Sequence, residues 1–150
     1  MEFFVKKFSE LSVNELYEIL KSRAEVFLIE QGIICQDMDD IDYKSSHYFL
    51  TDNEKIVAYL RAFECEDDLH TLSIGRVLTI EHGKGIGREL IERSLLQIKN
   101  ERVYNRIILH AQKYAIGFYE KFGFKVISDE FLEEGVIHVS MELKWKWYNV

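Results

Sequence analysis

The sequence predicts a mixed α/β fold, in which antiparallel strands lead into a β–α–β unit built around a glycine loop. Four of the eight glycines lie between Gly75 and Gly87, at alternate positions over 83–87. An apolar run, Ile74–Ile80, enters this loop, and apolar residues at helical spacing leave it from Leu90 to Ile98. A strand, a glycine loop and a helix are therefore expected in this order, with the other elements arranged around them.

The first part of the chain is predicted to form a strand and then a helix. Residues Met1–Phe8 are rich in aromatic and branched side chains, which is typical of a strand. Ser12 and Glu15 form a capping box, so a helix is expected from about Val13 to Ile29, with Gly32 as its stop signal. One face of this helix is expected to be buried, namely Leu16, Ile19, Leu20, Arg23, Ala24 and Phe27.

An acidic segment follows from Ile33 to Ser46 and has no clear period, which predicts a loop with at most one short helical turn. It does not match a calcium-binding loop, because no glycine stands at the bend and no glutamate closes the twelve-residue pattern. We interpret it as a solvated acidic loop that can face an amine substrate. Its aspartates are Asp37, Asp39, Asp40 and Asp42.

Three antiparallel strands are predicted next, because His47–Thr51, Ile56–Glu64 and Thr71–Ile80 are separated by short polar turns. The helix after the glycine loop is expected to end near Asn100, and a buried strand, Arg106–Gln112, follows it. Strand, helix and strand with short connections predict a right-handed parallel unit. The helix should contribute Leu90, Leu95 and Ile98 to the core.

The last part of the chain is predicted to contain one more helix and two strands. A short helix is expected from Tyr114 to Lys121, where Gly123 ends it. Segments Phe124–Ile127 and Val136–Lys144 should then form a pair of strands around the turn at 133–135.

Composition and charge favour one globular domain over residues 1–150, since 47% of the residues are hydrophobic and 13% aromatic. The formal charge of −7 and the lack of basic clusters argue against nucleic acid or an anionic membrane as partners and favour a cationic amine. Cys35 and Cys65 have neither disulfide nor zinc spacing, and we see no signal peptide or membrane-spanning run, so we expect a reducing cytoplasm.

The glycine loop is suited to a phosphate or pyrophosphate, because backbone N–H groups are uncovered and a helix N-terminus lies behind them. A Walker loop is excluded, because Lys84 is followed by Gly85 and not by serine or threonine. A dinucleotide fingerprint fits poorly, because this loop lies in the second half of a small protein.

Instead, the segment His82–Gly87 resembles the acetyl-coenzyme A loop of the GCN5-related N-acetyltransferases (GNAT), which have Arg or Gln where this chain has His82. The resemblance implies acetyl-coenzyme A as co-substrate, no metal, and the GNAT fold. It also implies these cofactor-binding residues: Val77, Leu78, Thr79, His82, Gly83, Lys84, Gly85, Ile86, Gly87, Arg88 and Gln112.

The whole chain is similar to the ElaA-type branch of this superfamily. The matching segments are Glu30-Gln31, Asp37-x-Asp39-x-x-Asp42, Ala58–Arg61, Ile74–Val77, Ala111-Gln112, Phe118–Phe124 and Glu134–His138. The chain departs from the pattern of that branch at Ile33, Cys35, Asp40 and Ile137, which belong mainly to the acceptor side. The reaction type is therefore better indicated than the acceptor.

The resemblance also implies roles in catalysis. Backbone N–H groups of 77–79 would hold the thioester carbonyl, and Tyr119 would donate a proton to the coenzyme A sulfur unless it is simply a core residue. Arg61 and Arg76 would bind a substrate carboxylate or form ion pairs with the acidic loop. Candidates for the general base are Glu30, His47, His110 and His138, of which Glu30 and His138 lie in matching segments.

The function expected is transfer of an acetyl group to a small-molecule or peptide primary amine by direct attack in a ternary complex. Two alternatives remain at this point, namely an acyl-coenzyme A sensor without turnover and a nucleotide-binding module that uses the same loop. The aromatic residues Trp145, Trp147 and Tyr148 are expected either to cap the core or to form a homodimer contact.

Overall fold

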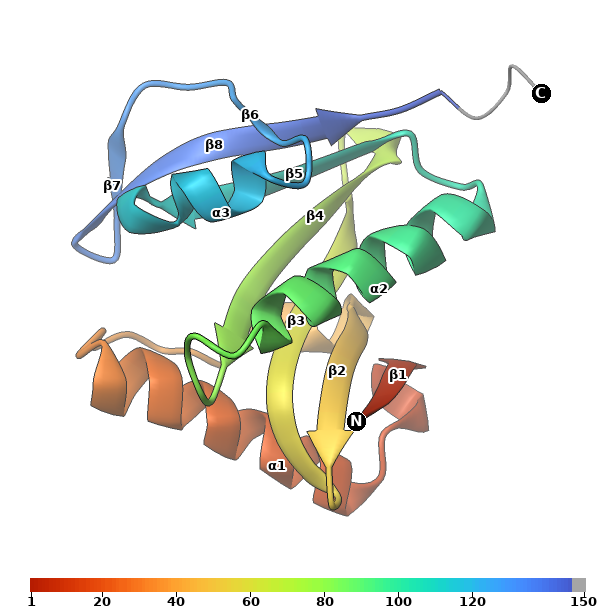
Figure 1. The fold of residues 1–150 in the computed structure, drawn as a ribbon, viewed down its shortest axis with the longest axis vertical. Helices are drawn as coiled ribbons and strands as arrows, with labels where there is room; N and C mark the ends of the chain where they lie inside the picture. The colour runs from red at the N-terminus through yellow and green to blue at the C-terminus, as the bar shows by residue number, and fades with distance from the viewer. Residues whose placement is uncertain (147–150) are drawn as a thin grey trace.

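The computed structural model describes residues 1–146 and shows an eight-stranded mixed sheet with helices on both faces (Figure 1). The strands are β1 (Glu2–Lys7), β2 (Ser46–Asp52), β3 (Lys55–Cys65), β4 (Asp68–Thr79), β5 (Arg106–Gln112), β6 (Lys125–Val126), β7 (Phe131–Glu133) and β8 (Val136–Lys144). The helices are α1 (Val13–Arg23), α2 (Ile86–Glu101) and α3 (Ile116–Glu120). Short helical segments are η1 (Phe8–Glu10), η2 (Ala24–Glu30), η3 (Ile41–Lys44) and η4 (Lys113–Ala115).

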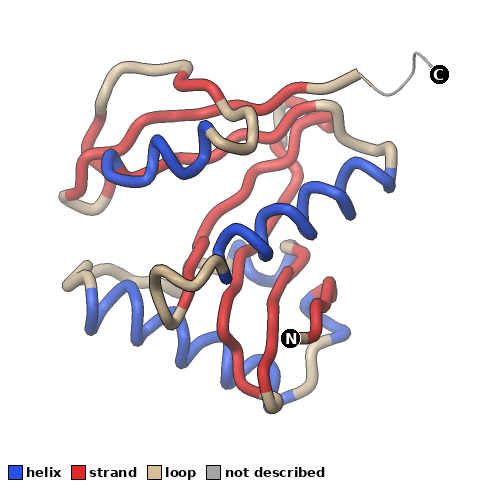
Figure 2. The backbone as a smooth tube through the Cα atoms, viewed as in Figure 1, coloured by secondary structure: helices blue, strands red, loops and turns tan. Residues whose placement is uncertain are grey.

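The sheet order is β1-β2-β3-β4-β5-β8-β6, and β7 pairs with β8. The predicted antiparallel strands β2, β3 and β4 are confirmed, as is the parallel pairing of β4 with β5. This parallel ladder is short and joins only Thr71–Ile74 to Arg106–Leu109. Beyond it β4 pairs with β3 alone and β5 with β8 alone, so the two middle strands separate (Figure 2).

The two faces of the sheet carry separate cores, because successive residues of a strand point to opposite sides. Leu50 and Leu60 face the core that α2 and α3 cover, and Phe49 and Tyr59 face the core under α1. In α2, Leu90 and Ile98 are fully buried and Leu95 packs beside them, as predicted. The helices on either side therefore hold the separated strands in place.

The first helix begins at the predicted capping box, where Ser12 Oγ accepts a bond from the Glu15 N–H. From Ala24 the turns widen, because the Gln31 N–H donates to the Val26 carbonyl five residues back. The wider turns change the angle between successive side chains, so Val26 is buried and Ala24 is exposed, contrary to our prediction for Ala24.

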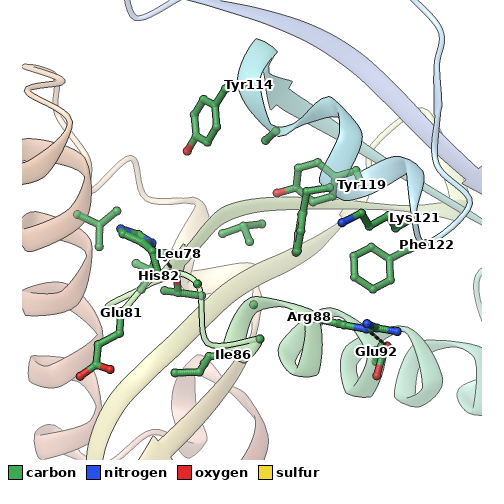
Figure 3. A pocket seen from close by; sticks show the side chains of 18 of the residues that line it. Leu78, Glu81, His82, Ile86, Arg88, Glu92, Tyr114, Tyr119, Lys121 and Phe122 are labelled. Carbon is green, nitrogen blue, oxygen red and sulfur yellow. Dashed lines mark hydrogen bonds and ion pairs between the residues drawn. The ribbon is translucent and has the colours of Figure 1, made fainter.

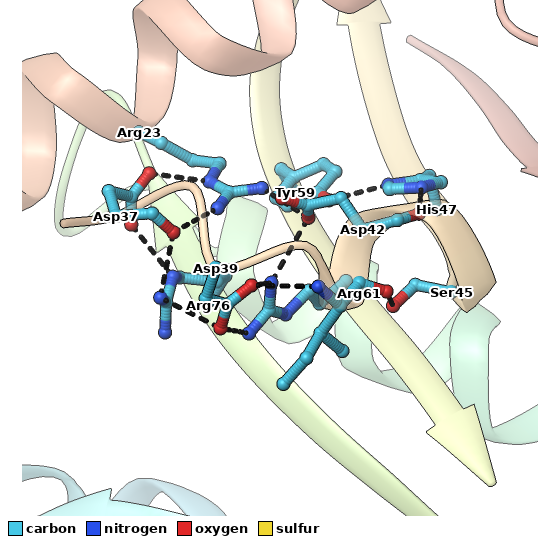
Figure 4. Close-up of polar contacts among 10 residues, drawn as sticks. Arg23, Asp37, Asp39, Asp42, Ser45, His47, Tyr59, Arg61 and Arg76 are labelled. Carbon is cyan, nitrogen blue, oxygen red and sulfur yellow. Dashed lines mark hydrogen bonds and ion pairs between the residues drawn. The ribbon is translucent and has the colours of Figure 1, made fainter. Parts of the chain in front are cut away.

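We predicted that the acidic segment is a solvated loop, and this is wrong. Three of its aspartates bind three arginines (Figure 4). It does contain the one short helical turn expected, η3. The ion pairs are Arg23–Asp37, Arg23–Asp42, Arg61–Asp39, Arg61–Asp42, Arg76–Asp37 and Arg76–Asp39. Arg23, on α1, is fully buried, whereas Arg61 and Arg76 are on β3 and β4. The loop is therefore held both by the helix and by the sheet.

The C-terminal strands differ in one respect from the prediction. β6 pairs with β8 as expected, but a further strand, β7, forms a tight hairpin with β8 across the turn at Glu134 and Gly135. Trp145 packs against the core, whereas Trp147 and Tyr148 lie outside the described residues. Within 1–146, no helix has the length and apolar character needed to cross a membrane.

Candidate active site

Two cavities meet where β4 and β5 separate. The larger, of about 710 Å³, is bordered by the glycine loop, the start of α2, and α3 (Figure 3). The smaller, of about 470 Å³, lies between the acidic loop and the β7–β8 hairpin. Residues common to both linings are Gln31, Val77, Tyr114, Ala115 and Tyr119. A molecule in one cavity can therefore reach a molecule in the other beside Val77 and Tyr119.

The glycine loop has the conformation that an anion site requires. Gly83 and Gly85 have φ angles of +76° and +74°, which L side chains rarely adopt, and a Cβ added to either would meet no atom within 4 Å. At Gly87 a Cβ would lie 3.2 Å from Thr79 Cγ2, so glycine permits the close approach of α2. The N-cap of α2 is Gly85, which has no side chain to cap the helix, so the first N–H groups of the helix are left available to an anion.

Cationic side chains stand around this loop with carboxylate partners. Lys84 pairs with Glu81, and Arg88 pairs with Glu92 at 2.8 Å between Nε and Oε1. Both cations are largely exposed, so they can turn towards a bound phosphate at little cost. Lys121 of the loop after α3 also lines the larger cavity.

His82 lies at the mouth of the larger cavity, as its place in the loop predicts. Its Nδ1 is 3.2 Å from Thr79 Oγ1 and its Nε2 is 2.5 Å from Glu30 Oε1. Glu30 is thus tied to the cofactor loop and lines neither cavity, which weakens its candidacy as the general base.

A bulge in β4 directs backbone donors into the gap. Arg76 has a φ of +54°, and the register advances by three residues in β4, from Gly75 to Leu78, for two in β3. The Ile80 N–H donates to β3 at 3.0 Å, and alternate N–H groups point to opposite edges, so those of Val77 and Thr79 face the edge that β5 has left. Leu78, included in the predicted set, instead directs its N–H to β3.

Tyr119 of α3 is a buried residue whose hydroxyl faces the larger cavity (Figure 3). Its ring packs edge-on against Phe118 and Phe124, which fixes its orientation. The hydroxyl makes no hydrogen bond within residues 1–146. Burial raises the pKa of Tyr119 above its ordinary value, so the phenol is protonated at neutral pH and able to donate.

One wall of the smaller cavity is formed by two aspartates of the acidic loop, Asp37 and Asp39, and by two arginines of the sheet, Arg61 on β3 and Arg76 on β4. Arg61 donates to Asp39 through both terminal nitrogens, at 2.7 and 2.6 Å. Arg76 Nη2 donates to the Asp37 carbonyl at 2.9 Å and lies 3.4 Å from Asp39. Of the two roles left open for these arginines, ion pairing with the loop is the one present in the structure.

The opposite wall carries two histidines around one carboxylate. His138, on β8, is a buried residue whose Nδ1 donates to the Val136 carbonyl at 2.8 Å. Glu133 lies between the rings, with Oε1 2.8 Å from His110 Nδ1 and Oε2 3.6 Å from His138 Nε2. Sequence reasoning missed Glu133, because it appeared only as part of a turn.

The remaining candidates have structural partners. His47 is buried between the Tyr59 hydroxyl and the Asp42 carbonyl, at 2.6 and 3.0 Å, and lines neither cavity. Burial lowers the pKa of His47, which keeps it neutral. Gln112, predicted to bind the cofactor, lines the smaller cavity and donates to Gln31 at 3.0 Å across the gap.

Comparison with known proteins agrees with this geometry. The family profile for the acetyltransferase (GNAT) domain matches residues 9–145. A UPF0039 protein of Schizosaccharomyces pombe is 38% identical over 96% of this chain and 97% of its own length. Protein ElaA of Escherichia coli is 34% identical over 89% of this chain and 90% of its own.

Solved structures show the same fold. The crystal structure of E. coli ElaA matches with a TM-score of 0.86 and 32% identity, over 94% of this chain and 97% of that one. An acyl-CoA N-acyltransferase from Pseudomonas aeruginosa matches with a TM-score of 0.87 and 28% identity, over 95% and 99%. This chain, with its separated central strands and glycine loop, therefore belongs to the GNAT acetyltransferase family and is similar to ElaA.

Proposed function

We propose that the protein transfers an acetyl group from acetyl-coenzyme A to a primary amine by direct attack within a ternary complex. The observation that supports this most is the meeting of two cavities at Val77 and Tyr119. One cavity carries an uncapped helix start and a glycine loop, and the other carries polar and ionisable side chains. Such an arrangement lets donor and acceptor bind together with their reacting atoms in contact.

In this proposal the larger cavity holds the coenzyme. The backbone of 83–87 and the first turn of α2 bind the pyrophosphate, with Lys84 and Arg88 adding positive charge. The N–H groups of Val77 and Thr79 hold the thioester oxygen, and they stabilise the negative charge that develops on it during attack. The fit is supported by the open space above Gly83 and Gly85.

Proton transfers complete the reaction. His138 Nε2 accepts a proton from the acceptor ammonium, because Nδ1 of the same ring is already a donor to a carbonyl. The free amine then attacks the thioester carbon, the carbon–sulfur bond breaks, and the Tyr119 hydroxyl protonates the leaving thiolate. The former amine nitrogen loses its second proton to solvent as the amide forms, and Tyr119 and His138 recover their starting protonation states by proton exchange with solvent. We favour His138 over Glu30, since His138 faces the smaller cavity.

The acceptor in this proposal is a small molecule or a peptide that carries the amine. The two cysteines, Cys35 and Cys65, are both free thiols, which supports a reducing compartment such as the cytoplasm.

Initial rates of thiol release, measured while acetyl-coenzyme A and a panel of amines are varied together, test the proposal. Intersecting double-reciprocal lines are expected for a ternary complex. Parallel lines would indicate an acetylated enzyme and refute direct attack. Tight binding of acetyl-coenzyme A without thiol release from any amine would favour the sensor alternative.

A further inference from the structure

The charges that line the smaller cavity do not balance. Its lining contains two arginines, Arg61 and Arg76, and four carboxylates, Asp37, Asp39, Glu133 and Glu134. The two arginines are already engaged by Asp37 and Asp39. Addition of the buried pair behind them, Arg23 and Asp42, adds one charge of each sign and leaves the balance unchanged. The cavity therefore has an excess of two negative charges, on Glu133 and Glu134.

The engaged arginines also argue against a carboxylate on the acceptor. A substrate carboxylate beside Arg61 or Arg76 would lie next to Asp37 and Asp39, which hold those guanidinium groups at 2.6 to 2.7 Å. Beside Arg61, both terminal nitrogens of which donate to Asp39, it would have to displace a pre-positioned carboxylate of the chain. Beside either arginine it would be repelled by the neighbouring aspartates.

The opposite wall offers two hydrogen-bond acceptors that face each other. The Val136 carbonyl can only accept, so His138 carries its proton on Nδ1 in the neutral ring, and Nε2 presents a lone pair. Nε2 lies 3.6 Å from Glu133 Oε2, beyond hydrogen-bond distance. The His138 side chain is only 9% exposed and stacks on Phe131, with the planes 22° apart, so the ring is held in this position.

An ammonium group beside this pair, with its nitrogen at about 2.8–3.0 Å from each atom, can donate one N–H to Glu133 Oε2 and another to His138 Nε2. His110 contacts only Oε1 of Glu133, at 2.8 Å, so Oε2 can still accept a hydrogen bond from a molecule in the cavity. The nearby cation Lys113 pairs with Glu130 at 3.0 Å, and neither residue lines the cavity.

We propose that Glu133, together with His138, binds the ammonium group of the acceptor, and that the acceptor is a small aliphatic amine with two positive charges and no carboxylate. This inference rests on the proposed acetyl transfer. The reacting ammonium bridges Glu133 Oε2 and His138 Nε2 from the cavity side and gives one proton to the imidazole. The second ammonium is held by the remaining excess charge at Glu134.

Three five-carbon probes test the acceptor class with acetyl-coenzyme A present. They are 1,5-diaminopentane, free lysine, which is the same diamine with a carboxylate added, and 1-aminopentane, which lacks the second charge. We expect kcat/KM for 1,5-diaminopentane to exceed the other two by about tenfold or more, the factor of one charge interaction of about 1.4 kcal/mol. Equal or better use of free lysine would overturn the inference.

The variant Glu133→Gln tests the residue, because the amide keeps the shape and can still accept from His110. The KM for 1,5-diaminopentane should rise about tenfold or more, as expected when a charge-assisted hydrogen bond is lost. Glu130→Gln is the matched control, since it removes the same charge but Glu130 lines neither cavity. Equal KM values in the two variants would overturn the role of Glu133.

Calorimetric titration with acetyl-coenzyme A separates this inference from the proposed function. Unchanged affinity in Glu133→Gln shows that the variant is folded and that its defect lies on the acceptor side. Binding of acetyl-coenzyme A by the parent protein, with turnover of other amines but not of the diamine, overturns the acceptor class alone. Absence of binding by the parent protein overturns the proposed function as well.

Discussion

The replacement Arg23→Met is the sharpest test of how the acidic loop is held. The side chain is fully buried and donates to Asp42 Oδ1 at 2.6 Å, to Asp37 Oδ2 at 2.8 Å and to the Asp37 carbonyl at 2.9 Å. Methionine fills much of the same volume without the charge. The three hydrogen bonds are lost, and Asp42, with a side chain only 11% exposed, keeps one arginine partner at 3.1 Å.

Each lost charge-assisted bond contributes about 1.5–3 kcal/mol. The remaining pairs, Asp37 with Arg76 and Asp42 with Arg61, reduce the sum, because neither carboxylate is left alone. We therefore expect a loss in unfolding free energy of about 3–5 kcal/mol, the range for a broken buried pair. For a chain of this length that lowers the melting temperature by about 6–20 °C.

Urea unfolding followed by tryptophan fluorescence measures the change. Lys21→Met is the matched control on the same helix, since Lys21 pairs with Glu18 at 2.8 Å but is half exposed, and its loss should leave the stability nearly unchanged. Adding Asp42→Asn to Arg23→Met should recover part of the loss, because Asp42 is then a largely buried carboxylate with one arginine partner instead of two, and the amide removes the cost of burying its charge. If Arg23→Met were as stable as Lys21→Met, the buried network would not be what holds the loop.

Three further predictions concern the cofactor side and acid stability. Gly85→Glu should abolish acetyl-coenzyme A binding in calorimetry, whereas Gly135→Glu, which has the same charge and a similar φ of +76°, should bind normally; weak binding by both would implicate general charge. Tyr119→Phe should lower turnover by about 10- to 1,000-fold at unchanged cofactor affinity, and Tyr48→Phe, a buried tyrosine outside both cavities, should not; equal rates would assign the proton to another group. Burial alone would raise the pKa of Asp39, but hydrogen bonds from Arg61 outweigh burial and lower this pKa from 3.8 to about 2. The contribution of the Asp39 carboxylate to stability is therefore complete above pH 3.8 and disappears as the pH falls towards about 2. Asp39→Asn should therefore be less stable than the parent near pH 6 and nearly equal to it near pH 2; a constant difference in urea unfolding would contradict this.

The periodicity of the sequence was enough to predict most of the fold. The capping box at Ser12 and the strand Arg106–Gln112 were found at the predicted residues, because both depend on local patterns. The separation of β4 from β5 depends on where a ladder ends, and no local pattern encodes that. The exposure of Ala24 was also missed, because a change from α to wider turns leaves no clear trace in apolar spacing.

The site was predictable where backbone conformation dictates residue type. Gly83 and Gly85 are in the left-handed region, so glycine is required and visible in the sequence. Charged residues are harder, because an aspartate that pairs with a buried arginine looks the same in sequence as one in solvent. Asp42 was predicted to be solvated but is a partner of a buried arginine, and Glu133 was read as part of a turn but lines the smaller cavity.

The separation of β4 and β5 also gives the sheet two inner edges, in addition to the outer edges at β1 and β6. Unpaired strand edges are templates for pairing with another chain, and proteins usually protect them with charge, proline or a covering element. Here Gln31, which directly follows η2, and Tyr119 of α3 line both cavities beside the inner edges. These elements cover the inner edges, which is one of the usual ways in which a strand edge is protected from pairing with another chain. The N–H groups of Val77 and Thr79 thus face a gap in the middle of the sheet and not an outer edge that a neighbouring chain could extend.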